Sequence, residues 1–238
     1  LLQLIMPELC ELDKVETRCG RSHKNNYDHT MEVLENVCRQ TSNLWLRWAA
    51  LLHDIGKPRS KRWDNQAGWT FRNHNVVGAR MIPSMFRRMK LPMDAKMKYV
   101  QKLVELHMRP IVISDEEVTD SAVRRLLNDA GDDIDDLMTL CEADITSKNQ
   151  VRKQHFLDNF RLVREKIADL KVRDYKRLFQ PCIDGREIME IFHLGSCPEV
   201  GALKQTLKDA VLDGKVANER EPLMELLMQK AKEHGLIE

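Results

Sequence analysis

The chain has few glycines, prolines and aromatic residues, and it lacks a long apolar segment. Its 238 residues include 10 glycines, 8 prolines and 5% aromatic residues. Long alternating runs of β-branched residues are also missing, so we expect helices almost throughout. No apolar run approaches the roughly 20 residues that a membrane span needs, and no signal peptide is visible. These absences predict an all-α protein without a membrane partner.

The six cysteines follow no pattern that is typical of a disulfide framework or a zinc-binding module. They form no CxxC pair, and their spacing is uneven. Scattered cysteines in a helical chain are most simply reduced thiols, which favours a cytoplasmic location.

The net charge is only +1, which excludes binding of polyanions through bulk charge. The charges are nevertheless segregated, because residues 57–90 carry nine basic residues against one acidic residue. Acidic residues dominate over 115–144, and the balance is basic again over 152–177. Such alternation usually reflects solvated helix faces, but a basic stretch next to a metal site would favour a phosphate-bearing substrate.

Apolar periodicity and helix-stop signals divide the chain into helical segments. A short β-hairpin or an irregular loop is expected over 59–73. The start, residues 1–9, reads as the end of an apolar helix that reaches a proline break without an initiator methionine, so we expect a fragment of a longer protein. The expected helices span approximately residues 31–38, 43–54, 74–90, 92–107, 121–128, 137–145, 151–172, 185–193, 199–213 and 219–234.

A histidine and an aspartate stand side by side at the end of the most apolar of these helices. His53 and Asp54 complete the helix expected over 43–54, and the Gly-Lys-Pro sequence at 56–58 stops it. Imidazole and carboxylate ligands without a thiolate suit a hydrolytic ion such as Mn, Fe, Ni, Zn or Mg. This pair therefore predicts a divalent metal site on the floor of a cleft.

Further histidines and a carboxylate recur on other helical segments, and a helical bundle can bring them together at its centre. Asp54 could bridge two ions, whereas His53 would hold only one. Two ions about 3.5–4 Å apart would clamp a phosphate and activate water. A lone histidine at a helix end is otherwise a cap or a core group, which is our interpretation of His23, His155, His193 and His234. The six candidate ligands are His29, His53, Asp54, His74, His107 and Asp144.

Lys57 and the segment that follows it have two interpretations each. Lys57 could neutralise a metal-bound phosphate, or it could be a solvated loop lysine. The segment 59–72 carries Trp63, Trp69 and Phe71. These rings could form a substrate lid that stacks on a base, or they could anchor a hairpin to the core.

These motifs resemble the HD-domain metal-dependent phosphohydrolases, whose signature is a histidine, a His-Asp doublet and a late aspartate. His29, His53-Asp54 and Asp144 match it, and His74 and His107 match the two further histidines of the binuclear subset. The resemblance implies an HD-type helical bundle. It also implies one metal held by His29, His53, Asp54 and Asp144, and a second held by Asp54, His74 and His107. Asp54 and Lys57 would then be the catalytic residues.

The chain also resembles the C-terminal half of bacterial CCA-adding tRNA nucleotidyltransferases and related poly(A) polymerases. The similar segments are 4–9, 183–189, 198–201 and 211–216. The resemblance implies tRNA or an RNA 3′ end as partner, together with a nucleotide substrate. The nucleotide-adding head of that family has no counterpart here, so this chain alone should not add nucleotides.

The C-terminal tail carries two glycines at helix approaches, where backbone amides can come close to a phosphate. By resemblance, this tail would help to hold tRNA. A small helical cap with glycine turns explains the same residues. The candidate RNA-binding residues are Gly185, Arg186, Gly201 and Lys204.

We thus predict a junction with a tRNA-handling body over 1–19, an HD domain over 20–172 and a helical tail over 173–238. The predicted activity is metal-dependent hydrolysis of a phosphoester in a nucleotide or at an RNA 3′ end. The alternative is a catalytically silent HD scaffold that serves tRNA binding, and a weaker one is hydrolysis of a signalling nucleotide. The sequence gives no indication of the oligomeric state.

Overall fold

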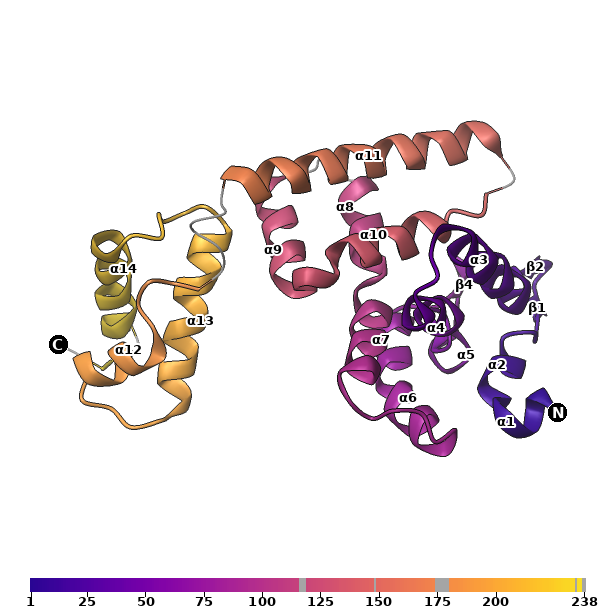
Figure 1. Cartoon of the computed structure of the whole chain (residues 1–238), viewed down its shortest axis with the longest axis horizontal. Coiled ribbons are helices and arrows are strands. Elements are labelled where there is room, and N and C mark those ends of the chain that lie inside the picture. The colour runs from indigo at the N-terminus through magenta and orange to yellow at the C-terminus, as the bar shows by residue number, and fades with distance from the viewer. Residues whose placement is uncertain (116–118, 148, 174–179, 234, 237–238) are drawn as a thin grey trace. The chain divides into compact units, whose positions relative to one another are not determined.

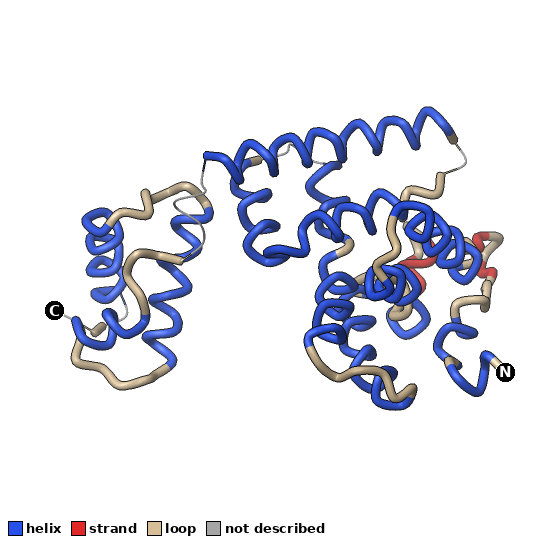
Figure 2. Tube along the Cα trace, viewed as in Figure 1, coloured by secondary structure: helices blue, strands red, loops and turns tan. Residues whose placement is uncertain are grey.

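The computed structural model describes residues 1–115, 119–147, 149–173, 180–233 and 235–236. Helices form nearly all of the regular structure of these residues, and the strands are confined to two short hairpins (Figures 1 and 2). The all-α prediction is therefore confirmed. None of the described helices is both long and apolar enough to cross a membrane.

The helices are α1 (Leu2–Ile5), α2 (Pro7–Glu11), α3 (Asn26–Gln40), α4 (Leu44–Leu52), α5 (Lys57–Ser60), α6 (His74–Arg88), α7 (Ala95–Leu106), α8 (Met108–Asp115), α9 (Asp120–Ala130), the 3-10 turn η1 (Gly131–Asp133), α10 (Ile134–Ala143), α11 (Gln150–Arg173), α12 (Gly185–Ile191), α13 (Pro198–Leu212) and α14 (Arg220–Glu233). The strands are β1 (Thr17–Arg18), β2 (Arg21–Ser22), β3 (Arg62–Asp64) and β4 (Gly68–Thr70). Both strand pairs, β1–β2 and β3–β4, are antiparallel.

The chain divides into two compact units. The first comprises Leu1–Glu117 and Ala130–Arg164, and the second comprises Val118–Asp129 and Glu165–Glu238. The candidate ligands all belong to the first unit. The domain limits at 19/20 and 172/173 stay predictions.

Helix α4 forms the centre of the first unit, as its sequence predicts. It packs against α3, α7 and α10, and Leu46, Ala49 and Leu52 are completely buried. Burial of such a leucine contributes about 1.5–3 kcal/mol. The Asn43 side chain caps the helix by accepting hydrogen bonds from the backbone N–H groups of the first turn. The core thus fixes α4, and α4 ends directly at His53.

The Gly-Lys-Pro sequence after α4 not only follows the end of that helix but also begins a further short helix. Pro58 lies in the first turn of a further short helix, α5, where its missing N–H leaves no bond unmade. Gly56 has a right-handed backbone (φ −82°). It is required because a Cβ there would lie 2.1 Å from the His74 carbonyl oxygen and 2.5 Å from the Gly78 nitrogen. This close approach lets α5 pack on α6.

The helix expected to end near His107 does end there, and a second helix follows at once. Helix α7 already ends at Leu106, and α8 begins at Met108 with Pro110 in its first turn. Proline is tolerated in the first turn because the N–H groups there have no partner within the helix. His107 therefore occupies the junction between two helices.

The N-terminal elements differ from the single helix end that the sequence predicts. The helix is broken at Met6 into α1 and α2, and Pro7 begins the second piece. The hairpin β1–β2 follows, with residues too few and too polar to give an alternating signal.

The second unit has an apolar core of its own. Helix α13 packs against α12 and α14. Arg125 of α9 donates to the Asp213 carboxylate at 2.6 and 2.9 Å, which ties α9 to the end of α13. The buried residues of the core are Ile183, Ile188, Val200, Leu203, Leu207, Leu223 and Leu227.

Candidate metal centre

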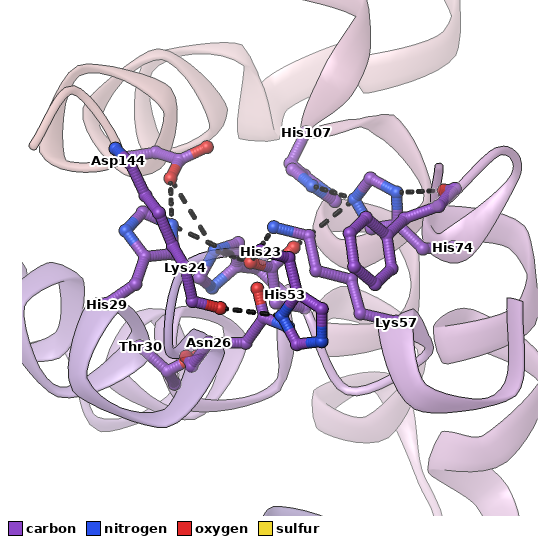
Figure 3. Close-up of polar contacts among 12 residues, drawn as sticks. His23, Lys24, Asn26, His29, Thr30, His53, Lys57, His74, His107 and Asp144 are labelled. Atoms are coloured by element: carbon purple, nitrogen blue, oxygen red, sulfur yellow. Dashed lines mark hydrogen bonds and ion pairs between the residues drawn. The ribbon is translucent and has the colours of Figure 1, made fainter. Parts of the chain in front are cut away.

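The fold brings all six candidate ligands into one cluster. Most of them stand at helix ends. His53 and Asp54 follow α4, His74 begins α6, and His107 and Asp144 follow α7 and α10. His29 projects from the first turns of α3. Figure 3 shows His29 and Asp144 at one end of the cluster and His74 and His107 at the other.

The first group of ligands surrounds one oxygen of Asp54. His29 Nε2 lies 3.6 Å and His53 Nε2 lies 3.3 Å from Asp54 Oδ2. Asp144 Oδ1 completes this side of the cluster, 2.8 Å from His29 Nε2 and 3.6 Å from His53 Nε2. The His29, His53 and Asp54 atoms are close enough together to share one ion.

The second group uses the other oxygen of the same carboxylate. His74 Nε2 lies 3.2 Å from Asp54 Oδ1 and 3.2 Å from His107 Nε2. The ligand atoms of Asp54, His74 and His107 could likewise hold one ion. Asp54 is thus common to both groups, and each of its oxygens faces one of them.

Backbone carbonyls orient three of the imidazoles. In His53, His74 and His107 the Nδ1 atom lies 2.7–2.8 Å from the carbonyl oxygen three residues earlier. A carbonyl can only accept, so Nδ1 carries the proton and the Nε2 lone pair of each neutral ring points into the cluster. Such a partner on the far ring nitrogen is the usual support of a metal-binding histidine.

Two polar atoms in the middle of the cluster lack a hydrogen-bond partner within the described part of the chain. His53 Nε2 and Asp54 Oδ2 are buried without a hydrogen-bond partner among the described residues. The Nε2 atoms of His74 and His107 face each other as two lone pairs when both rings are neutral. Unsatisfied buried polar atoms cost about 1–3 kcal/mol each. Divalent ions in the two ligand groups would satisfy these atoms, so the residues fit such ions.

The protonation states of Asp54 and His107 are also those that a metal ligand needs. Burial opposes ionisation of Asp54, but His53 and Lys57 outweigh it and hold the pKa of Asp54 well below its ordinary value. Burial, together with nearby His53, lowers the pKa of His107 to about 4. Asp54 is therefore charged and His107 neutral at pH 7, the forms that bind metal.

His53 is the ring on which a cation would displace a proton. Burial alone would lower the pKa of His53, but the Asp54 and Asp144 carboxylates raise it to about 10. Metal binding at Nε2 must then release that proton, so metal affinity should increase with pH.

Lys57 is not a solvated loop lysine. Its Nζ lies 2.5 Å from Asp54 Oδ2, and its side chain is only 19% exposed. The contact is an ion pair without hydrogen-bond geometry, since Asp54 Oδ2 remains without a hydrogen bond. Its role toward phosphate stays a prediction.

Two neighbours of the cluster had no signal in the sequence. The Thr146 hydroxyl lies 3.0 Å from His29 Nδ1 and so orients the one ligand ring that lacks a carbonyl partner. The Cys141 thiol donates to the His107 carbonyl at 3.0 Å, and burial raises the pKa of this thiol well above its ordinary value. Cys141 therefore supports the His107 backbone as a neutral thiol.

The aromatic residues of the segment 59–72 pack against one another and against His23. Trp63 and Trp69 meet edge to face across the hairpin with centroids 5.2 Å apart. His23 packs edge-on against Trp69 and Phe71 at 5.9 and 5.4 Å. These rings are engaged with one another, which favours the anchor over a base-stacking lid. His23, which we interpreted as a cap or core group, belongs to neither ligand group, and His234 lies outside the described residues.

The two tail glycines were expected to let backbone amides approach a phosphate, and the structure shows a different arrangement at each. The Asp184 side chain caps α12 by accepting hydrogen bonds from the Arg186 and Glu187 N–H groups. This carboxylate occupies the place of a phosphate. A Cβ on Gly201, which lies within α13, would meet nothing within 4 Å. The backbone amides at the start of α12 are therefore already occupied, and an RNA-binding role for Gly185, Arg186, Gly201 and Lys204 stays a prediction.

Comparison with known proteins connects the cluster to a sequence family. The family model described as the HD domain matches residues 26–149. The chain is 30% identical over 225 residues to an A-adding tRNA nucleotidyltransferase of Deinococcus radiodurans, covering 93% of this chain and 50% of the relative. It is 28% identical over 230 residues to a CC-adding tRNA nucleotidyltransferase of Thermus thermophilus, covering 93% of this chain and 48% of the relative. The chain thus spans about half the length of these relatives.

Proposed function

Because the chain belongs to the HD domain family, we propose that its histidine–aspartate cluster binds divalent metal and hydrolyses a phosphoester. The proposed substrate is a nucleotide or an RNA 3′ end. The single observation that carries the proposal is the pair of ligand groups that share Asp54. One carboxylate between two imidazole-rich groups is suited to hold two ions side by side.

The proposed first ion is held by His29, His53, Asp54 and Asp144, and the second by Asp54, His74 and His107. Imidazole ligands suit Fe, Ni or Zn, and the carboxylates of Asp54 and Asp144 also suit Mn, whereas Mg usually prefers a site made of oxygen ligands. When bound, these ions polarise a phosphoryl oxygen and acidify water.

The residues around the ions have distinct tasks in this proposal. The carbonyl bonds at Nδ1 hold the His53, His74 and His107 rings in place, so the ligands are preorganised before metal arrives. Burial of His53 and Asp54 excludes bulk water and strengthens electrostatic interactions at the reacting phosphate. Lys57, adjacent to Asp54, is placed to neutralise a phosphate oxygen.

Hydrolysis by the metal-loaded chain tests this function. Bis-p-nitrophenyl phosphate and 2′,3′-cyclic AMP are offered after loading with Mn or Ni. We expect turnover that falls by at least about a hundredfold in Asp54→Ala, while Asp28→Ala is unaffected. Asp28 is a matched control, because it lies on α3 directly before His29 and belongs to neither ligand group. Turnover that persists in a folded Asp54→Ala protein would contradict the proposal.

The names of the relatives favour a second candidate function. Both proteins that match 93% of this chain are named for adding nucleotides to tRNA. The cluster could then be a silent scaffold within a cytoplasmic tRNA-binding protein. A folded, metal-loaded chain that binds tRNA but hydrolyses neither probe would favour this scaffold.

A further inference from the structure

A cavity of about 410 Å³ opens beside the His29 and Asp144 end of the metal centre. His29 and Asp144 line it together with Thr146, so its wall includes two of the proposed ligands. Its size falls within the range of about 300–1,000 Å³ that is typical of small-ligand pockets. It can therefore enclose one small molecule, or one terminal unit of a polymer, next to the ligands.

Two cations without a carboxylate partner line the same cavity. Within the described part of the chain, neither Lys24 nor Arg152 forms an ion pair, and both side chains are exposed. Arg164, by contrast, pairs with Glu142 at 2.5 Å. Unpaired cations that line a pocket favour an anionic ligand.

The lining of the cavity also includes two aromatic residues. Phe156 is half-buried, and the Arg152 guanidinium carbon lies 5.6 Å from the centre of its ring. Phe160 is 1% exposed and lines the cavity from the core side. A ring beside a guanidinium group is a stacking surface for a nucleobase.

We propose that this cavity binds a single nucleotide, with the base against Phe156 and the phosphate near Lys24 and Arg152. The proposal deepens the function proposed above and rests on it only for the chemistry that follows binding. It makes the substrate a mononucleotide or the terminal nucleotide of an RNA. A bare phosphoester would leave the aromatic part of the pocket unused.

Calorimetric titration with 5′-AMP, ribose 5-phosphate and inorganic phosphate tests the pocket, in EDTA and again with Mn. The wild type should bind 5′-AMP more tightly than the other two probes. Phe156→Leu, which keeps an apolar side chain, should weaken 5′-AMP binding by about tenfold and leave ribose 5-phosphate unchanged. Arg152→Ala should weaken both by about tenfold, and the neighbouring Lys153→Ala should change neither.

Equal affinity for 5′-AMP and inorganic phosphate would overturn the proposal, because it would show an anion site without a nucleoside pocket. Unchanged 5′-AMP binding in both variants, or no binding in either buffer, would also overturn it. These results are independent of turnover. A chain that binds 5′-AMP through Phe156 but hydrolyses nothing supports the pocket and contradicts the hydrolase. Hydrolysis of bis-p-nitrophenyl phosphate without nucleotide binding would support the hydrolase and contradict the nucleotide pocket.

Discussion

At the scale of single residues, the centre depends on which nitrogen of each histidine carries the proton. Backbone carbonyls accept hydrogen bonds from Nδ1 of His53, His74 and His107, so the Nε2 atom of each ring faces the cluster around Asp54. The same types of residues without this arrangement would form ordinary histidine–carboxylate bonds. The Lys57 ammonium group pairs with the same Asp54 carboxylate that the histidines surround.

Replacement of Lys57 separates a role toward phosphate from a structural role. Lys57→Met keeps the apolar stem and removes the charge that pairs with Asp54 at 2.5 Å. We expect the turnover number to fall by about tenfold to a hundredfold, because a charge-assisted contact is worth about 1.5–3 kcal/mol. Metal stoichiometry, measured by elemental analysis, should not change. Lys61→Met, which removes a lysine paired with Glu16, is the control. Loss of metal in Lys57→Met would instead assign the residue a structural role.

At the scale of elements, the ligands are placed by where helices end. The α4–α5 turn and the start of α6 approach each other through two glycines, Gly56 and Gly78. This approach sets the distance between Asp54 and His74, because each residue lies within about a turn of one of the glycines. The packing of α5 on α6 therefore determines the second ligand group.

A methyl group at position 56 should disrupt this approach. In Gly56→Ala the new Cβ would lie 2.1 Å from a backbone oxygen, which cannot move without shifting α6. We expect destabilisation of about 3 kcal/mol and preferential loss of the ion at His74 and His107. Thermal melting and metal stoichiometry measure both effects. Gly201→Ala, whose Cβ meets nothing within 4 Å, should be neutral or stabilising by up to about 1 kcal/mol. Equal behaviour of the two variants would refute the packing argument.

An ion pair between α2 and α6 gives a pH-dependent contribution to stability. Arg88 donates to both Glu8 oxygens at 2.6 and 2.7 Å and holds the pKa of Glu8 below its usual 4.5. A lowered pKa in the folded state stabilises the fold at pH values above 4.5, and this contribution is lost as the pH falls below that value.

Glu8→Gln should therefore reduce the free energy of unfolding by about 1 kcal/mol at pH 7. The difference from the wild type should shrink as the pH is lowered from about 5 to about 3. Urea unfolding followed by tryptophan fluorescence reports this unit, because all four tryptophans of the chain lie in it. Glu35→Gln, which removes a pair with 64% of the glutamate side chain exposed, should have almost no effect. A difference that grows at low pH would contradict the assigned sign.

At the scale of the whole molecule, the sequence predicted much of the fold and the composition of the cluster. The apolar pattern of α4 and its end at His53-Asp54 were readable because periodicity and stop signals are local. The steric need for glycine at position 56 and the contact of Thr146 with His29 could not be predicted, because both depend on contacts between segments distant in sequence. The Asp184 cap was not predicted, because a glycine at a helix start is equally compatible with free backbone amides.

Binding of tRNA by the tail is a prediction at this scale. If Arg186 and Lys204 contact phosphates, neutralising both with glutamine should weaken tRNA binding and lower the salt slope by about 0.7–0.9 for each phosphate that is no longer neutralised. Filter binding between about 50 and 200 mM salt, roughly the range over which such interactions are screened, measures this slope. Lys232→Gln on α14 is the control. An unchanged slope in the double variant would exclude these two residues from the RNA interface.

The most direct test of the central claim is the metal stoichiometry of the purified chain. The chain is loaded with Mn or Ni, freed of excess ion and measured by elemental analysis, with Asp54→Ala measured beside it. Because Asp54 is common to both ligand groups, the wild type should retain up to two ions and a folded Asp54→Ala protein should lose them together. Retention of no ion by the wild type, or of the same amount by both proteins, would show that this cluster is not a metal centre.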